Sequence, residues 1–278
     1  MTGLKVRTIW VLAKRELRLT MYGIGIYIAI LISLVISATI LQNYLEAVGR
    51  DRLLITASPF AYPLFIATGV CAVYLALASA TSIARERNMQ TLELLFYGPV
   101  DPVSYIFAKY LKAVLSYLFI IILLVCYFFI ASLTSNLGLS FKFLGVLVLS
   151  LFLSSCVISF GILMSTLAKS VRTSVLLLLG IVGGLIAIQI ALEVLMNMGE
   201  VNLAPALFFL RNTLSTLHAI VKWVSPFYYL DKGMEAVSLG SVAKFAASGI
   251  FSTIYSAVFL VFSILALKIK GVRKTTGE

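Results

Sequence analysis

The sequence predicts an all-α membrane protein with six transmembrane helices, and three observations support this fold class. Hydrophobic residues make up 61% of the 278-residue chain and charged residues only 12%, about half the fraction usual in soluble domains. Six stretches without Asp, Glu, Lys or Arg each reach the roughly 20 residues that a helix needs to cross about 30 Å of hydrocarbon. Lys and Arg are also concentrated in alternate connecting segments, which is typical of multi-pass proteins.

We expect a single transmembrane domain, residues 1–278, with spans at about 22–42, 60–83, 102–133, 142–167, 174–196 and 245–267. The third span is longer than the membrane is thick, so its first turns, with Lys109 and Lys112, should stand in the interface or the cytoplasm. Fifteen of the 22 Lys and Arg residues lie on one side, in segments 1–21, 84–112, 169–173 and 268–278. Positive charge favours the cytoplasmic side, so we expect both termini there.

The N-terminal segment, residues 1–21, has the pattern of an amphipathic helix that lies in the headgroup region. One helical face carries Val6, Ile9, Trp10, Ala13 and Leu17. The other carries the basic residues Arg7, Lys14, Arg15 and Arg18, which would face anionic lipid. The alternative is a basic flank with no function beyond setting the topology.

Residues 201–244 should form an outer loop before the last span. Within it, 204–223 is apolar, but Arg211 near its centre costs about +2.5 to +3.5 kcal/mol on the insertion scale and roughly cancels the gain from the apolar side chains. We therefore expect a re-entrant or surface-lying helix there. Ser225-Pro226 should end it, and 227–239 should form a second short helix.

Charge, helix formers and turn signals come together in one stretch, residues 82–110, between two long apolar runs. Arg85, Glu86 and Arg87 end the preceding run, and Asn88 could cap a short helix that ends at Gly98-Pro99. Asp101-Pro102 then predicts the start of a new helix, with proline at its first position. The stretch should therefore consist of a helix end, a surface helix, a turn and a helix start.

The pattern I-x-R-E-R-x-x-x-T-L-E-L-L-x-x-x-P-V, followed by a helix that contains Lys, resembles the segment between the second and third membrane helices of ABC-2 type transporter permeases. The resemblance implies that 84–101 forms a cytoplasmic coupling helix that docks on a separate ATPase subunit. A familiar variant of the family pattern has Gly just before Thr-Leu-Glu, where Gln90 stands here. The coupling residues implied by this resemblance are Arg85, Glu86, Arg87, Thr91, Leu92, Glu93, Leu94, Leu95 and Pro99.

Within this segment, Glu86 and Glu93 are seven residues apart and would share a face of a continuous helix, where they could engage basic residues of the ATPase. The leucines would fill an apolar cleft in the ATPase. Two alternatives stay open: the glutamates could be solvated surface groups, and the leucines could pack against the chain's own helices.

Several kinds of chemistry are not expected of this chain. It contains no G-x-x-x-x-G-K-[ST], so it should not be the ATPase, and ATP and Mg²⁺ should bind to a partner subunit. No cofactor or metal site is expected, because the three cysteines are widely spaced and His218 is the one histidine. No Asp or Glu lies in the middle of the six apolar stretches, where a proton-coupled carrier would be expected to have one. Glu193 is the acidic residue that comes nearest to such a position.

We therefore expect the permease subunit of an ATP-driven ABC-2 type exporter in the cell membrane. Its partners would be an ATPase subunit, a second copy of the permease or a close relative, and membrane lipid. Nucleic acid is not expected, since topology explains the basic charge. The alternative function is a membrane scaffold or assembly factor without transport. Lipid-linked glycan, antibiotic, peptide and ion stay open as substrates.

Overall fold

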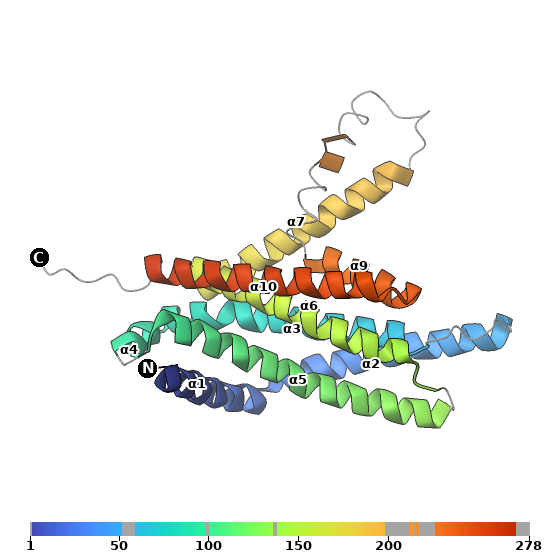
Figure 1. The fold of residues 1–278 in the computed structure, drawn as a ribbon, viewed down its shortest axis with the longest axis horizontal. Coiled ribbons are helices and arrows are strands. Elements are labelled where there is room, and N and C mark those ends of the chain that lie inside the picture. The colour runs from blue at the N-terminus through green and yellow to red at the C-terminus, as the bar shows by residue number, and fades with distance from the viewer. Residues whose placement is uncertain are drawn as a thin grey trace, which may run out of the picture.

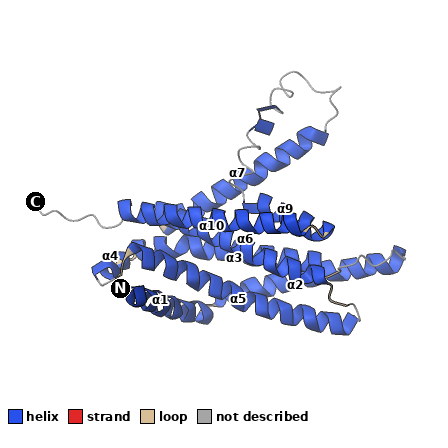
Figure 2. Cartoon of the chain, viewed as in Figure 1, coloured by secondary structure: helices blue, strands red, loops and turns tan. Residues whose placement is uncertain are grey.

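The computed structural model describes residues 2–51, 59–97, 100–135, 138–197, 212–213, 215–216 and 226–270. Every regular element within these residues is a helix (Figure 2). The helices are α1 (Thr2–Tyr22), α2 (Ile24–Asp51), α3 (Ala61–Asn88), α4 (Thr91–Tyr97), α5 (Pro102–Ser135), α6 (Phe141–Leu167), α7 (Val171–Asn197), α9 (Pro226–Leu239) and α10 (Val242–Lys270).

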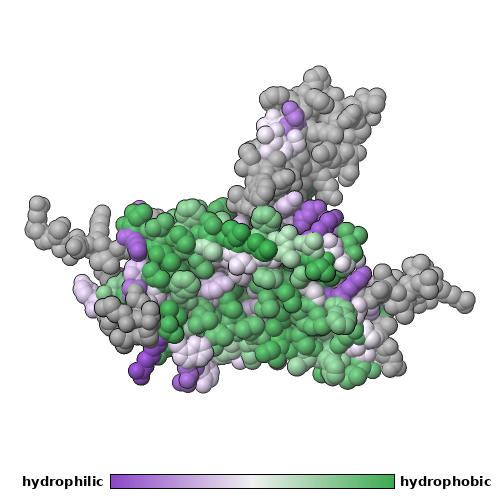
Figure 3. Space-filling model, viewed as in Figure 1, coloured by the Kyte–Doolittle hydropathy of each residue, from purple (hydrophilic) through white to green (hydrophobic). Residues whose placement is uncertain are grey.

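Six of these helices are long and apolar enough to cross a membrane: α2, α3, α5, α6, α7 and α10. The prediction of six spans is therefore confirmed. Hydrophobic side chains cover most of the bundle's visible face, and hydrophilic ones gather near its ends (Figure 3). Since α5 has 34 residues, it is about 51 Å long, which exceeds the roughly 30 Å of hydrocarbon and leaves several turns outside it.

The centre of the bundle is the contact between α3 and α6, and small residues let these two helices approach closely. A Cβ atom added to Gly161 of α6 would lie 2.7 Å from the backbone oxygen of Ala76 in α3. Further along the same contact, Ser165 Oγ accepts hydrogen bonds from the backbone N–H groups of Ile83 (3.0 Å) and Ala84 (2.9 Å). The contact is thus both tightly packed and hydrogen-bonded near the end of α3.

Helix α7 leaves the bundle at an angle, so it contacts the other helices mainly near its start (Figure 1). There, Ser174 Oγ donates a hydrogen bond to the backbone oxygen of Ala80 (2.6 Å), and Leu178 is buried. Farther along, Leu179, Ile186 and Ile190 are exposed. An apolar cavity of about 380 Å³ lies in the angle between α7, α3 and α6.

The element boundaries follow the turn signals with one correction. Gly23 separates α1 from α2, Pro102 begins α5 and Pro226 begins α9, as their conformational preferences predict. Asn88, however, does not cap a helix: it is the last residue of α3, and Met89 follows as its C-cap. Its side chain cannot act as an N-cap because its backbone still belongs to the preceding helix. Most of 204–223 lies outside the described residues.

Candidate functional site

The turn between α3 and α4 lies at one end of the bundle (Figure 1), and Met89 of this turn lines the same cavity as Arg15 and Glu16 of α1. Two backbone hydrogen bonds close the end of α3, from Met89 N–H to Arg85 O (3.0 Å) and from Gln90 N–H to Arg87 O (3.1 Å). Gln90 has a φ of 57°, a left-handed conformation that glycine usually adopts at the end of a helix. This is the position at which a variant of the family pattern has glycine, and a side chain there costs about 1–2 kcal/mol.

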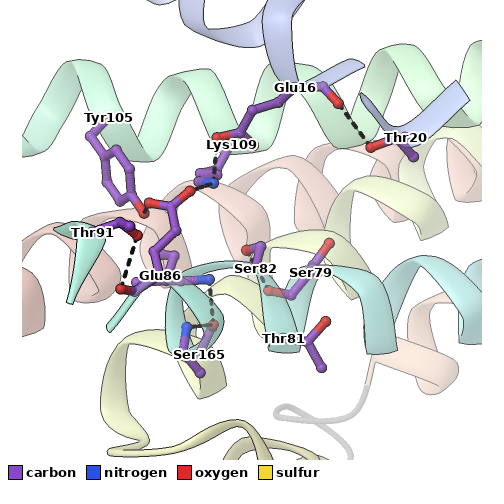
Figure 4. A network of polar contacts seen from close by, with 12 residues as sticks. Glu16, Thr20, Ser79, Thr81, Ser82, Glu86, Thr91, Tyr105, Lys109 and Ser165 are labelled. Carbon is purple, nitrogen blue, oxygen red and sulfur yellow. Dashed lines mark hydrogen bonds and ion pairs between the residues drawn. The ribbon is translucent and has the colours of Figure 1, made fainter. Parts of the chain in front are cut away.

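Three helices meet next to this turn in a partly buried ion-pair cluster, which we call the Lys109 cluster: Glu16, Glu86, Tyr105 and Lys109 (Figure 4). Lys109 of α5 forms ion pairs with both Glu16 of α1 and Glu86 of α3. Tyr105 Oη donates a hydrogen bond to the second oxygen of Glu86 (2.6 Å). The ammonium also lies 5.4 Å from the centre of the Tyr105 ring.

The charged groups of the Lys109 cluster are largely shielded from water. The side chain of Lys109 is 5% exposed, and those of Glu16 and Glu86 are 15% and 21% exposed. Water screens such charges poorly, and removing one partner of a buried pair typically costs 3–5 kcal/mol because the other charge is left uncompensated. One ammonium with three donors between two carboxylates satisfies both acids at once. The cluster therefore holds the ends of α1, α3 and α5 at fixed positions.

Arg87 ties the same end of α3 to the turn that joins α6 to α7. Its Nη1 donates hydrogen bonds to the backbone oxygens of Ala168 (2.5 Å) and Thr166 (3.2 Å). Charge-assisted bonds of this kind are about twice as strong as neutral ones. A displacement of the α3 end would therefore reach α1 and α5 through the Lys109 cluster, and α6 and α7 through Arg87.

The predicted coupling residues occupy different environments. Arg85 and Thr91 are exposed, and Thr91 Oγ1 donates to the backbone oxygen of Glu86 (3.2 Å). Leu92 is only 6% exposed and, with the partly buried Leu95, belongs to the chain's own core, which was the alternative for the leucines. Glu93 belongs to α4, on the far side of the turn from Glu86.

The helix is not continuous between Glu86 and Glu93, since residues 89–90 form a turn. Their spacing of seven therefore does not place them on one helical face. Pro99 lies outside the described residues, as do the side chains of Glu93 and Leu94. The outermost described aromatic of α4 is Tyr97, which is 86% exposed.

Sequence reasoning missed Glu16, Tyr105 and Lys109 as members of the site. A signal existed, because Glu16 is the one acidic residue in the basic segment 1–21 and Lys109 interrupts a largely apolar helix. Charges in such surroundings need partners. No group of three or more metal-ligating side chains occurs among the residues that the structure describes.

A comparison with known families gives a match over most of the chain. The model of the family described as "ABC-2 family transporter protein" matches residues 10–272, which include all of the Lys109 cluster and α4. No curated protein matches the chain.

Proposed function

Because the chain belongs to the ABC-2 family of membrane transporters, we propose that it is the transmembrane permease subunit of an ATP-driven exporter. A separate nucleotide-binding subunit, which carries ATP and Mg²⁺, docks on α4 and the α3–α4 turn. The observation that carries this proposal is the linkage of that turn to four helices, through the Lys109 cluster and through Arg87.

In this mechanism the ATPase subunit closes on ATP and thereby pushes α4, and the end of α3 moves together with α4. Glu86 acts inside the bundle through Lys109, whereas Glu93 and Leu94 contact the ATPase. Arg87 carries the displacement to the start of α7, whose described side chains beyond Leu178 are all exposed or only partly buried. A helix held mainly at one end can swing with little loss of packing, which supports α7 as the moving wall of the transport path.

The complete transporter contains two permease chains, either two copies or this chain and a close relative, and two ATPase subunits. In such a pairing, the second permease chain or lipid would cover the exposed apolar side chains of α7. The transporter lies in the cell membrane with both termini in the cytoplasm. The concentration of Lys and Arg at the end that carries α4 supports this orientation.

The test combines copurification with an ATPase assay in liposomes. Glu93→Lys and Leu94→Asp should each weaken binding of the ATPase subunit or uncouple hydrolysis from transport, with the stronger effect for Leu94→Asp because it places a charge in an apolar cleft. Leu239→Asp is a matched control, since Leu239 ends α9 at the other end of the bundle and is exposed. If both α4 variants keep full partner binding and hydrolysis, the docking assignment is wrong. The chain would then be better explained as a membrane scaffold.

A further inference from the structure

A polar cavity of about 560 Å³ lies between α1, α3 and α5, directly beside the Lys109 cluster. Its lining includes four basic and two acidic side chains. Cavities of this size are typical of small-molecule sites. Its charged side chains are Arg15, Glu16, Arg85, Glu86, Lys109 and Lys112.

The charge that this cavity offers to a ligand is positive. Glu16 and Glu86 are both engaged by Lys109, so they are already neutralised in part. Arg15, Arg85 and Lys112 form no ion pair with any carboxylate among the residues that the structure describes. Two guanidinium groups and an ammonium therefore face one space from three different helices, and guanidinium binds phosphate with two parallel hydrogen bonds.

Besides the charged groups, the lining holds apolar side chains and three hydroxyls, of Thr20, Thr81 and Ser82, which donate to backbone oxygens of their own helices. Leu19, Tyr74 and Ala78 line the part of the cavity farther from the α3 end. From Arg85 to Tyr74 the cavity follows α3 for eleven residues, or about 16 Å. Beside Gly23 in the lining, Tyr22 and Ile24 are large exposed hydrophobic residues. The cavity is thus charged near the α3 end and more apolar farther along, where lipid tails would begin.

We propose that this cavity binds the headgroup of an anionic phospholipid from the leaflet on the α4 side of the membrane. The phosphate lies between Arg15, Arg85 and Lys112, and the glycerol and first methylenes lie against Leu19 and Tyr74. A free phosphate ion would use only the charged end, so the apolar part favours the lipid. Basic pockets between membrane helices are known to suit such headgroups. This inference goes beyond the proposed function and does not depend on an ATPase partner.

The test is native mass spectrometry of the permease alone, released from membranes with equal amounts of phosphatidylglycerol and phosphatidylcholine. The wild-type chain should retain phosphatidylglycerol in preference to phosphatidylcholine. The double variant Arg15→Gln/Arg85→Gln should lose that retention roughly 25-fold, since each basic residue near an anionic headgroup contributes about fivefold. Lys169→Gln/Arg172→Gln is the matched control: it removes the same charge from exposed positions in the α6–α7 turn, outside the cavity, and should retain the lipid. Unchanged thermal unfolding checks that each variant is folded.

Two results would overturn the proposal. Equal retention by both double variants would mean that the lipid binds the surface generally. Displacement of the lipid by excess inorganic phosphate would mean that the cavity takes a soluble anion. Neither result depends on whether α4 docks an ATPase, so failure here is distinguishable from failure of the proposed function.

Discussion

Replacing Lys109 with methionine removes the ammonium from the Lys109 cluster and keeps most of the side chain's volume. Glu16 and Glu86 then lose the cation that forms an ion pair with both, at sites where their side chains are 15% and 21% exposed. Removal of one partner from a buried pair costs about 3–5 kcal/mol, and the partial exposure of both acids favours the lower end. We therefore expect a loss of about 3 kcal/mol in the free energy of unfolding.

The assay is reversible unfolding in mixed micelles, with Lys169→Met as the control. Lys169 lies exposed in the α6–α7 turn, so its replacement should change stability by less than about 0.5 kcal/mol. Adding Glu16→Gln to Lys109→Met removes one of the two uncompensated charges and should restore at least about 1 kcal/mol. If Lys109→Met is as stable as the control, or if the second substitution restores nothing, the cluster does not hold the three helices together.

Three further predictions concern the backbone, the packing and the topology. Gln90→Gly should raise stability by about 1 kcal/mol in the same unfolding assay, because glycine adopts the φ of 57° without strain, and a loss instead would refute the strain argument. Gly161→Val should prevent normal packing of α3 on α6 and lower the midpoint of thermal unfolding steeply. Gly183→Val should not, because a Cβ atom at position 183 meets open space; equal effects of the two variants would contradict the packing argument. In a background without the native cysteines, Thr275→Cys should resist an impermeant thiol reagent added from outside, and rapid labelling would place the C-terminus outside.

The sequence was sufficient to predict the six spans, because a charge-free stretch of 20 or more residues has few other stable environments. Turn signals in the sequence were similarly reliable where a single residue sets the backbone conformation. Pro102 and Pro226 cannot continue a preceding helix, and both begin helices in the structure. These features depend on residues close together in the chain, which is why sequence alone could give them.

The interior of the candidate site could not be predicted in the same way. Lys109 is 93 residues from Glu16 and 23 from Glu86, and only the packing of α1 and α3 on α5 brings the three together. Glu86 was expected at a docking surface, but the turn at Gln90 separates it from Glu93 and the Tyr105 hydroxyl holds it inside. The helix pattern alone does not reveal such a turn, because its left-handed residue is not a glycine.

Site-specific photocrosslinking tests the central claim, that the α4 end of the permease docks an ATPase subunit. A photoreactive amino acid replaces Tyr97, the 86% exposed aromatic at the end of α4, or as a control Leu239 at the other end of the bundle. The account predicts a covalent product between permease and ATPase from position 97 and none from position 239. A complex that copurifies intact but gives no product at 97, or gives equal products at both positions, would contradict it.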